Sequence, residues 1–186
     1  LKHAGIGEKD LTIMGMPPDQ ITAAWQQEAI DAAFVWPPAQ TEILKTGKRL
    51  VGADKVAEWG YPTFNVWVVN KEFAAANKDS LIAFMKAVDA ANRDYLKDMA
   101  AWTADSDQVK AIAAQTGAAP ETVVVSLEGY KFLPLAEQLE DAWMGGGIAK
   151  AVKDTAAFLK SAGRIDQVAD DYSKSVNTDY LKAAVK

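Results

Sequence analysis

The chain contains no cysteine and only one histidine among its 186 residues. The lack of thiols excludes disulfides, a thiolate zinc site and a cysteine nucleophile, although it does not fix the redox compartment. A single histidine, His3, gives almost no support for a Ser-His-Asp triad or a histidine-based metal centre. The sequence therefore points away from these hydrolytic and metal sites.

Two further absences concern partners. Basic residues are in the minority, with 20 Lys and Arg against 25 Asp and Glu, and the net charge of -5 disfavours a nucleic-acid partner. The sequence has no run of eighteen apolar residues, which argues against a membrane-spanning segment. Its 49% of apolar and 24% of charged residues are ordinary for a globular protein, and its length suits one large domain or two small lobes.

The beginning of the sequence predicts that the chain is a piece of a longer protein. It starts at Leu1 instead of methionine, and no basic-then-apolar leader follows. Residues 1–7, LKHAGIG, are typical of the last turn of a helix that Gly5 closes as a left-handed cap. We therefore expect a fragment in which the start of this helix is absent.

Up to about Asn70, short apolar segments alternate with helix signals. The pairs Pro17-Pro18 and Pro37-Pro38 are typical of helix starts, where a missing backbone N–H costs nothing. Residues 32–36 are apolar and short, as buried parallel strands usually are, whereas residues 48–51 give only a weak strand signal. The predicted strands are residues 11–16, 32–36, 48–51 and 64–69. This rhythm predicts βαβ crossovers and an α/β fold with a mainly parallel sheet flanked by helices.

From Lys71 onward the sequence predicts an almost wholly helical C-terminal half. Apolar residues recur at spacings of four and three between Leu81 and Met99, as on one face of a long amphipathic helix. Asp89 and Arg93 stand four apart on its outer side and are spaced for a weak ion pair. The further predicted helices are residues 107–116, 120–128, 148–162 (closed by Gly163), 166–174 and 178–184.

The sequence offers no constellation of catalytic side chains. The neighbouring carboxylates Asp170 and Asp171 fit a solvated helix face better than a general acid/base pair. The glycine run 145–147 lacks the strand and the lysine-serine pair of a phosphate loop, so we expect a flexible connector there. The sequence therefore predicts neither catalytic residues nor a metal site.

The aromatic residues are more informative, because the sequence holds six tryptophans. Trp36 ends a predicted strand, and Trp59 and Tyr61 lie in the loop that feeds the next one. Ligands of open α/β sheets bind outside the carboxyl ends of the strands, where an aromatic ring can hold a cation. For Trp36 and Trp59, ligand contact and simple packing stay equally open, whereas we expect Trp25 and Trp67 to pack in the core.

Several of these segments resemble one family of solute receptors. The resemblance runs from Leu1 to the C-terminus, and its most specific part lies between Met16 and Val69. The chain resembles the receptors of bacterial ABC importers that bind taurine, nitrate and aliphatic sulfonates. The matching segments are residues 16–18 (MPP), 21–25 (ITAAW), 31–36 (DAAFVW), 47–48 (GK), 58–60 (EWG), 62–69 (PTFNVWVV), 154–160 (DTAAFLK), Gly163 and 169–173 (ADDYS).

The resemblance implies a two-lobed periplasmic binding protein of type II whose first lobe is incomplete in this chain. Residues 1–62 would form most of the second lobe, and residues 63–70 would be the strand that crosses at the hinge. Residues 71–186 would be the mostly helical part that completes the first lobe. An incomplete lobe predicts an unusually apolar exposed surface around residues 64–69 and the long helix.

The family's function implies a periplasmic, non-enzymatic receptor without a cofactor. Its partners would be a small ligand, taurine or an alkanesulfonate, and an ABC permease in the inner membrane, with no nucleic acid. The expected sulfonate site, a helix N-terminus, lies upstream of Leu1. Related sequences usually have aspartate at Asn65, and asparagine accepts a hydrogen bond but supplies no charge, so the choice of sulfonate stays open. The expected ligand-binding residues are Met16, Pro17, Trp36, Pro37, Trp59, Thr63 and Asn65.

Two alternatives stay open at this point because one scaffold can host several functions. The first is the ligand-sensing domain of a regulator, which an upstream DNA-binding helix-turn-helix would favour. The second is an enzyme related to the thiamine-precursor synthases. That family needs a site rich in histidine and cysteine, which this sequence does not offer.

Overall fold

A computed structural model describes the backbone of residues 1–186 and every side chain except that of Lys2. The chain divides into two compact units, which are described separately. The first unit comprises Leu1–Pro62 and Ala101–Tyr130, and the second comprises Thr63–Ala100 and Lys131–Lys186. The chain therefore passes between the units three times.

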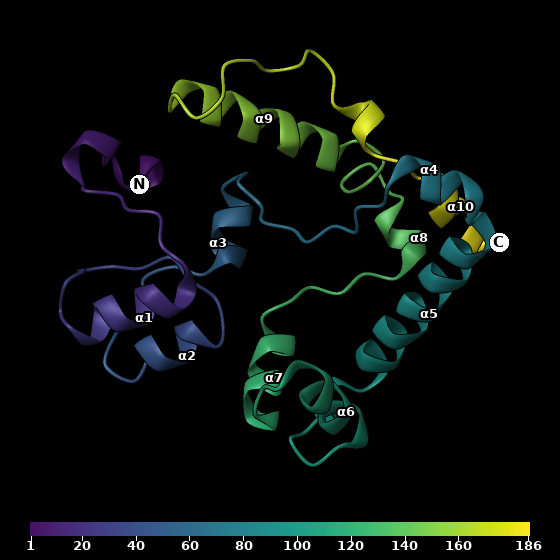
Figure 1. The fold of residues 1–186 in the computed structure, drawn as a ribbon, viewed down its shortest axis with the longest axis horizontal. Helices are drawn as coiled ribbons and strands as arrows, with labels where there is room; N and C mark the ends of the chain where they lie inside the picture. The colour runs from purple at the N-terminus through teal and green to yellow at the C-terminus, as the bar shows by residue number, and fades with distance from the viewer. The chain divides into compact units, whose positions relative to one another are not determined.

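All regular elements of the described residues are helices (Figure 1). The α-helices are α1 (Pro18–Gln26), α2 (Ala39–Ile43), α3 (Ala53–Glu58), α4 (Lys71–Ala76), α5 (Lys78–Lys97), α6 (Asp107–Thr116), α7 (Pro120–Glu128), α8 (Leu135–Gln138), α9 (Gly147–Ser161) and α10 (Asp179–Val185). The 3-10 turns are η1 (Lys2–Ala4), η2 (Glu8–Asp10), η3 (Met99–Ala101) and η4 (Ser173–Ser175). The C-terminal half is mostly helical but not almost wholly so, because residues 129–134, 139–146 and 162–172 lie outside the helices.

The helix ends follow from local chemistry. Pro18 and Pro120 occupy the first turns of α1 and α7, where no backbone N–H is needed. The Ser106 side chain accepts the Val109 N–H at the start of α6. Gly163 has a φ of 66° just past α9, a left-handed conformation that side chains disfavour. The expected helix starts at Pro18, Asp107 and Pro120 and this glycine cap are confirmed.

In the first unit, α1 packs against α2, and α6 packs against α7. In the second unit, α10 packs against both α5 and α8, and α4 contacts α5 (Figure 1). The core of the second unit forms where α5, α8 and α10 meet, because each of them supplies apolar side chains there. The core residues are Leu135, Leu181 and Ala184, with Ile82, Met85, Leu139 and Met144 packed against them.

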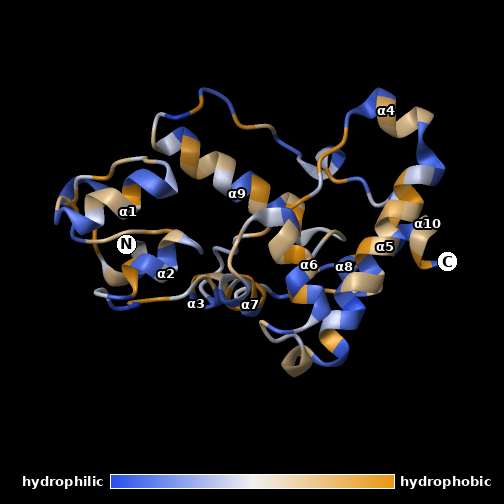
Figure 2. Ribbon diagram, turned by 60° about the horizontal axis from the view of Figure 1, so that its bottom comes forward, coloured by the Kyte–Doolittle hydropathy of each residue, from blue (hydrophilic) through white to orange (hydrophobic). Residues whose placement is uncertain are grey.

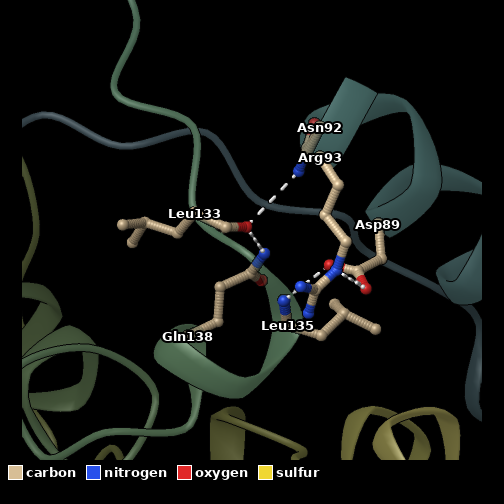
Figure 3. A network of polar contacts seen from close by, with 6 residues as sticks. All are labelled: Asp89, Asn92, Arg93, Leu133, Leu135 and Gln138. Atoms are coloured by element: carbon tan, nitrogen blue, oxygen red, sulfur yellow. Dashed lines mark hydrogen bonds and ion pairs between the residues drawn. The ribbon is translucent and has the colours of Figure 1, made fainter. Parts of the chain in front are cut away.

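A polar network ties α8 to the middle of α5 (Figure 3). The Asp89 carboxylate accepts the backbone N–H of Leu135 at 2.8 Å and the Arg93 Nε–H at 2.7 Å. The carbonyl of Leu133 accepts one hydrogen bond from the side-chain amide of Asn92 and another from that of Gln138. The expected Asp89–Arg93 pair is confirmed. The prediction that Asp89 lies on the outer side of this helix is wrong, because its side chain faces α8 and is only 18% exposed.

The expected parallel sheet is absent from the described residues, because none of them forms a β-strand. Residues 11–16, 32–36, 48–51 and 64–69 connect the helices without regular structure. A strand is defined by hydrogen bonds to a neighbouring strand, so apolar alternation alone does not produce one. All residues of these segments are exposed except Met16 and Val35, which are half-buried, and the exposed backbone groups can bond to water.

The unpaired segments leave apolar side chains exposed, as expected around residues 64–69 and the long helix. Val68 is 88% exposed, and Val66 on the same segment is 55% exposed. Phe84 of α5 is also exposed. Hydrophobic residues lie on the ribbons between helices as well as on the helices themselves (Figure 2). This expectation of exposed apolar surface is confirmed.

Two local predictions differ from the structure. The charged segment before Tyr61, expected as a loop, contains α3. The helix expected at residues 166–174 is a loop that ends in η4. There the Asp171 carboxylate accepts the Ser173 N–H, and the Tyr172 hydroxyl accepts the Ala169 N–H. These local side-chain bonds compete with the helical backbone pattern.

The glycine run 145–147 is a tight turn and not the expected flexible connector. The N–H of Gly145 donates to the Glu140 carbonyl, and the N–H of Gly147 donates to the Asp141 carbonyl. A Cβ on Gly147 would lie 2.0 Å from the carbonyl oxygen of Ala142. Glycine is therefore required here because another stretch of backbone lies too close for a side chain.

No helix in the described part of the chain combines the length and the apolar character needed to cross a membrane.

We expect Asp89→Ala to lower the free energy of unfolding by about 1–3 kcal/mol, because it leaves the N–H of the buried Leu135 without its acceptor. Arg93→Ala is the matched control, since it removes only an exposed ion pair worth about 0.5 kcal/mol. Urea unfolding measures both variants. Equal losses would show that Asp89 acts through Arg93 alone.

We expect Gly147→Ala to lower the free energy of unfolding by about 1–3 kcal/mol, because the added Cβ forces the backbone at Ala142 to move. Gly15→Ala is the control, since its Cβ would meet no atom within 4 Å. Thermal or urea unfolding compares the two. A Gly147→Ala variant as stable as Gly15→Ala would contradict the tight turn.

Candidate ligand-binding site

Four of the expected binding residues lie where the chain enters α1 and α2. Pro17 is the N-cap of α1, directly after the half-buried Met16. Trp36 precedes the Pro37-Pro38 pair, and its carbonyl accepts the N–H of Gln40 in the first turn of α2. The Trp36 side chain is 58% exposed, so its ring is accessible for a contact. Because α1 packs against α2, both entry segments belong to one compact helix pair.

Trp25 lies in this helix pair and packs there. Its indole Nε1–H donates to Thr46 Oγ1 at 2.9 Å. Its ring lies so close to Gly47 that a Cβ there would meet the ring at 2.9 Å. The prediction that Trp25 is a packing residue is therefore confirmed, and Gly47 is needed because the ring occupies the space of a side chain.

The helix pair also borders a hollow of about 500 Å³. None of the seven expected binding residues lines it. The lining residues are Thr22, Trp25, Gln26, Glu28, Ile30, Asp31, Glu42, Ile43, Lys45 and Thr46. Glu42 and Lys45 pair with each other there at 2.5 Å. This hollow is thus separate from the residues that the sequence analysis selects.

Trp59 is held at the end of α3 by a glycine-based cap. Gly60 has a φ of 91°, and its N–H donates to the Ala57 carbonyl. The N–H of Tyr61 donates to the Val56 carbonyl, which completes a Schellman motif. The cap fixes where the chain turns immediately after the tryptophan.

The imidazole of His3 stacks on the half-buried indole of Trp59. The ring centroids are 3.8 Å apart and the planes differ by 13°. In the sequence, His3 was a candidate only for catalysis or metal binding, and its contact with Trp59 was not predicted. No spacing rule links two residues this far apart in the sequence, and only the fold brings them together.

Thr63 and Asn65 lie in the second unit, whereas the other five expected binding residues lie in the first. Both side chains are exposed on the segment before α4. Trp67 of the same segment makes an edge contact with Phe84 at 5.0 Å but is 69% exposed. The expectation that Trp67 packs in the core is wrong in this structure, because the segment has no neighbouring strand to cover it.

The carboxylates offer no catalytic arrangement. Asp171 is fully exposed and accepts hydrogen bonds from the backbone N–H and the hydroxyl of Ser173. These bonds stabilise the charged form and hold the pKa of Asp171 below its ordinary value. Among the described side chains, no group of three or more His, Cys, Asp or Glu residues gathers to hold a metal ion.

Comparisons with known proteins identify the family. Residues 1–116 match the model of the substrate binding domain of ABC-type glycine betaine transport systems. The taurine-binding periplasmic protein of Escherichia coli K12 is 35% identical over 182 residues, which cover 98% of this chain and 56% of that protein. A putative aliphatic sulfonates-binding protein of Bacillus subtilis 168 is 25% identical over 182 residues, which cover 95% of this chain and 49% of that protein.

The chain thus spans about half the length of the curated relatives it matches. The resemblance to taurine and aliphatic sulfonate receptors is confirmed by both relatives. The matched model covers more than half of the chain and describes binding domains of transport systems, not enzymes. The chain therefore belongs to the family of substrate-binding domains of ABC-type glycine betaine transport systems, and this family supports the periplasmic-binding fold class.

Proposed function

We propose that the chain is part of a periplasmic receptor that binds taurine or a related small aliphatic sulfonate and delivers it to an ABC permease. The observation that carries this proposal is the 35% identity to a taurine-binding periplasmic protein across 98% of the chain. The second relative, described as binding aliphatic sulfonates, supports the same ligand class. The bound ligand is released unchanged, so no catalytic residue is needed.

The proposed site follows from the two charges of taurine. Its ammonium needs hydrogen-bond acceptors or aromatic faces, and the exposed ring of Trp36 and the half-buried ring of Trp59 are aromatic groups of that kind. The side-chain carbonyl of Asn65 accepts a hydrogen bond from an ammonium without adding a charge. Met16, Pro17, Pro37 and Thr63 complete the proposed set of contacts.

The proposed architecture assigns residues 1–62 to the second lobe, residues 63–70 to the crossing strand and residues 71–186 to the first lobe. The exposed apolar segments 11–16, 32–36, 48–51 and 64–69 support a sheet that forms when neighbouring strands cover them. Their apolar side chains would then be buried on both faces of a mainly parallel sheet. Closure of two such lobes around a ligand would present their outer surface to the permease.

A direct test titrates taurine, ethanesulfonate and glycine betaine calorimetrically into a complete two-lobed protein that carries this chain. We expect taurine to bind more tightly than glycine betaine, because the sulfonate receptors are the relatives that match across the whole chain. Preferential binding of glycine betaine, the ligand class in the family's description, would contradict the proposed ligand.

In the same protein, Trp36→Ala should weaken taurine binding at least tenfold, or about 1.4 kcal/mol, because the ring contributes a cation–π contact and apolar contact area. Trp25→Phe is the control, since Trp25 packs against Gly47 and is not one of the proposed ligand contacts. Calorimetry reports both affinities. An unchanged affinity of Trp36→Ala would show that this ring does not contact the ligand.

Asn65→Asp should tighten taurine binding about three- to thirtyfold, because a charge-assisted hydrogen bond replaces a neutral one at some desolvation cost. Ethanesulfonate has no ammonium and should gain nothing or bind more weakly, because the new carboxylate repels it. Both ligands are titrated at one ionic strength. An unchanged ratio of the two affinities would mean that residue 65 does not contact the ammonium.

A further inference from the structure

The stacked rings of His3 and Trp59 join two separate segments of the first unit. His3 belongs to η1, whereas Trp59 is the C-cap of α3. A separation of 3.8 Å with nearly parallel planes is a face-to-face contact over most of the imidazole. One face of the indole is therefore covered by His3.

A left-handed glycine follows each of the two aromatic residues in the sequence and fixes the backbone there. Gly5 has a φ of 70° two residues after His3, and Gly60 has a φ of 91° directly after Trp59. The N–H of Ile6 donates to the Leu1 carbonyl at 3.1 Å and closes the turn around His3. Both rings thus project from turns whose geometry depends on glycine.

We propose that His3 is the positioning residue for Trp59, and that a ligand ammonium binds over the indole face that His3 leaves uncovered. This inference rests on the proposed function and deepens it, because it assigns a residue that orients the ring and does not itself touch the ligand. A cation–π contact requires the cation over the face of the ring, so the orientation of the indole decides whether it forms. His3 restricts that orientation before the ligand arrives, which lowers the ordering cost of binding.

That His3 orients the Trp59 ring is tested on this chain labelled with 5-fluorotryptophan. The Trp59 resonance is identified by its loss in Trp59→Phe, and its ¹⁹F shift is then compared in His3→Ala, His3→Phe and Lys9→Ala. We expect His3→Ala to move this resonance, His3→Phe to move it less, and Lys9→Ala, an exposed change in η2, to leave it in place. An unmoved resonance in His3→Ala would overturn the inference.

The effect of His3 on ligand binding is tested by titrating taurine and ethanesulfonate into a complete two-lobed protein that carries this chain. His3→Ala removes the stacked aromatic pair, and the loss of that interaction should weaken taurine binding about 2- to 12-fold. Ethanesulfonate has no ammonium and should be affected little, and His3→Phe should restore taurine binding because it retains a flat ring. Equal losses for both ligands would show a merely structural role and overturn the inference.

Trp59→Ala separates a failure of this inference from a failure of the proposed site. If Trp59→Ala weakens taurine binding while His3→Ala does not, Trp59 stays a binding residue and only the role of His3 is wrong. If Trp59→Ala leaves taurine binding unchanged, Trp59 is not a ligand contact, and both the proposed site at Trp59 and the inference are wrong.

Discussion

The contact between Asp89 and the backbone of Leu135 is the interaction on which the second unit depends. It joins residues that are 46 positions apart, and it places α8 against the middle of α5. Leu135 is then buried, with 2% of its surface exposed, where Leu181 and Ala184 of α10 pack against it. One carboxylate thus satisfies a helix N-terminus and brings together three helices that are distant in the sequence.

The extended segments of the chain, in contrast, lack a distant partner for their backbone groups. Apart from the charged residues Lys48 and Arg49, their side chains are mostly apolar, like those of buried strands, but their backbone groups have no neighbouring strand to pair with. The helices form without the sheet because their hydrogen bonds are internal, whereas each strand depends on another segment. The exposed surface of Phe34, Leu50 and Val68 is the consequence.

The tryptophans show how the fold gives one residue type different roles. Trp25 is fixed by Thr46 and by the absence of a side chain at Gly47, so its ring contributes to packing. Trp59 has His3 on one face, whereas Trp36 is exposed. The exposed ring of Trp36 is suited to an organic cation, and the indole face of Trp59 opposite His3 is the second proposed contact. In the proposed function these aromatic faces would hold the ammonium of taurine.

The sequence by itself determined the features whose causes lie within one turn of the chain. It predicted α6 and α7 at their observed bounds, the helix start at Pro18, the left-handed Gly5 and Gly163, and the Asp89–Arg93 pair. The candidate ligand site was derived from the same local features and from the family resemblance, and its geometry around a ligand stays a prediction. Caps, prolines and pairs four residues apart act locally, so their effects can be predicted from spacing.

Only the tertiary structure decided the contacts between distant segments. The Asp89–Leu135 bond, the stacking of His3 on Trp59 and the backbone that crowds Gly147 have no signature in the spacing of the sequence. The same reason explains why strands were predicted although the described residues form none, since pairing requires a partner whose position the local sequence does not specify. Hydrogen bonds and packing across the fold depend on where the rest of the chain lies, and that is determined only when the helices pack.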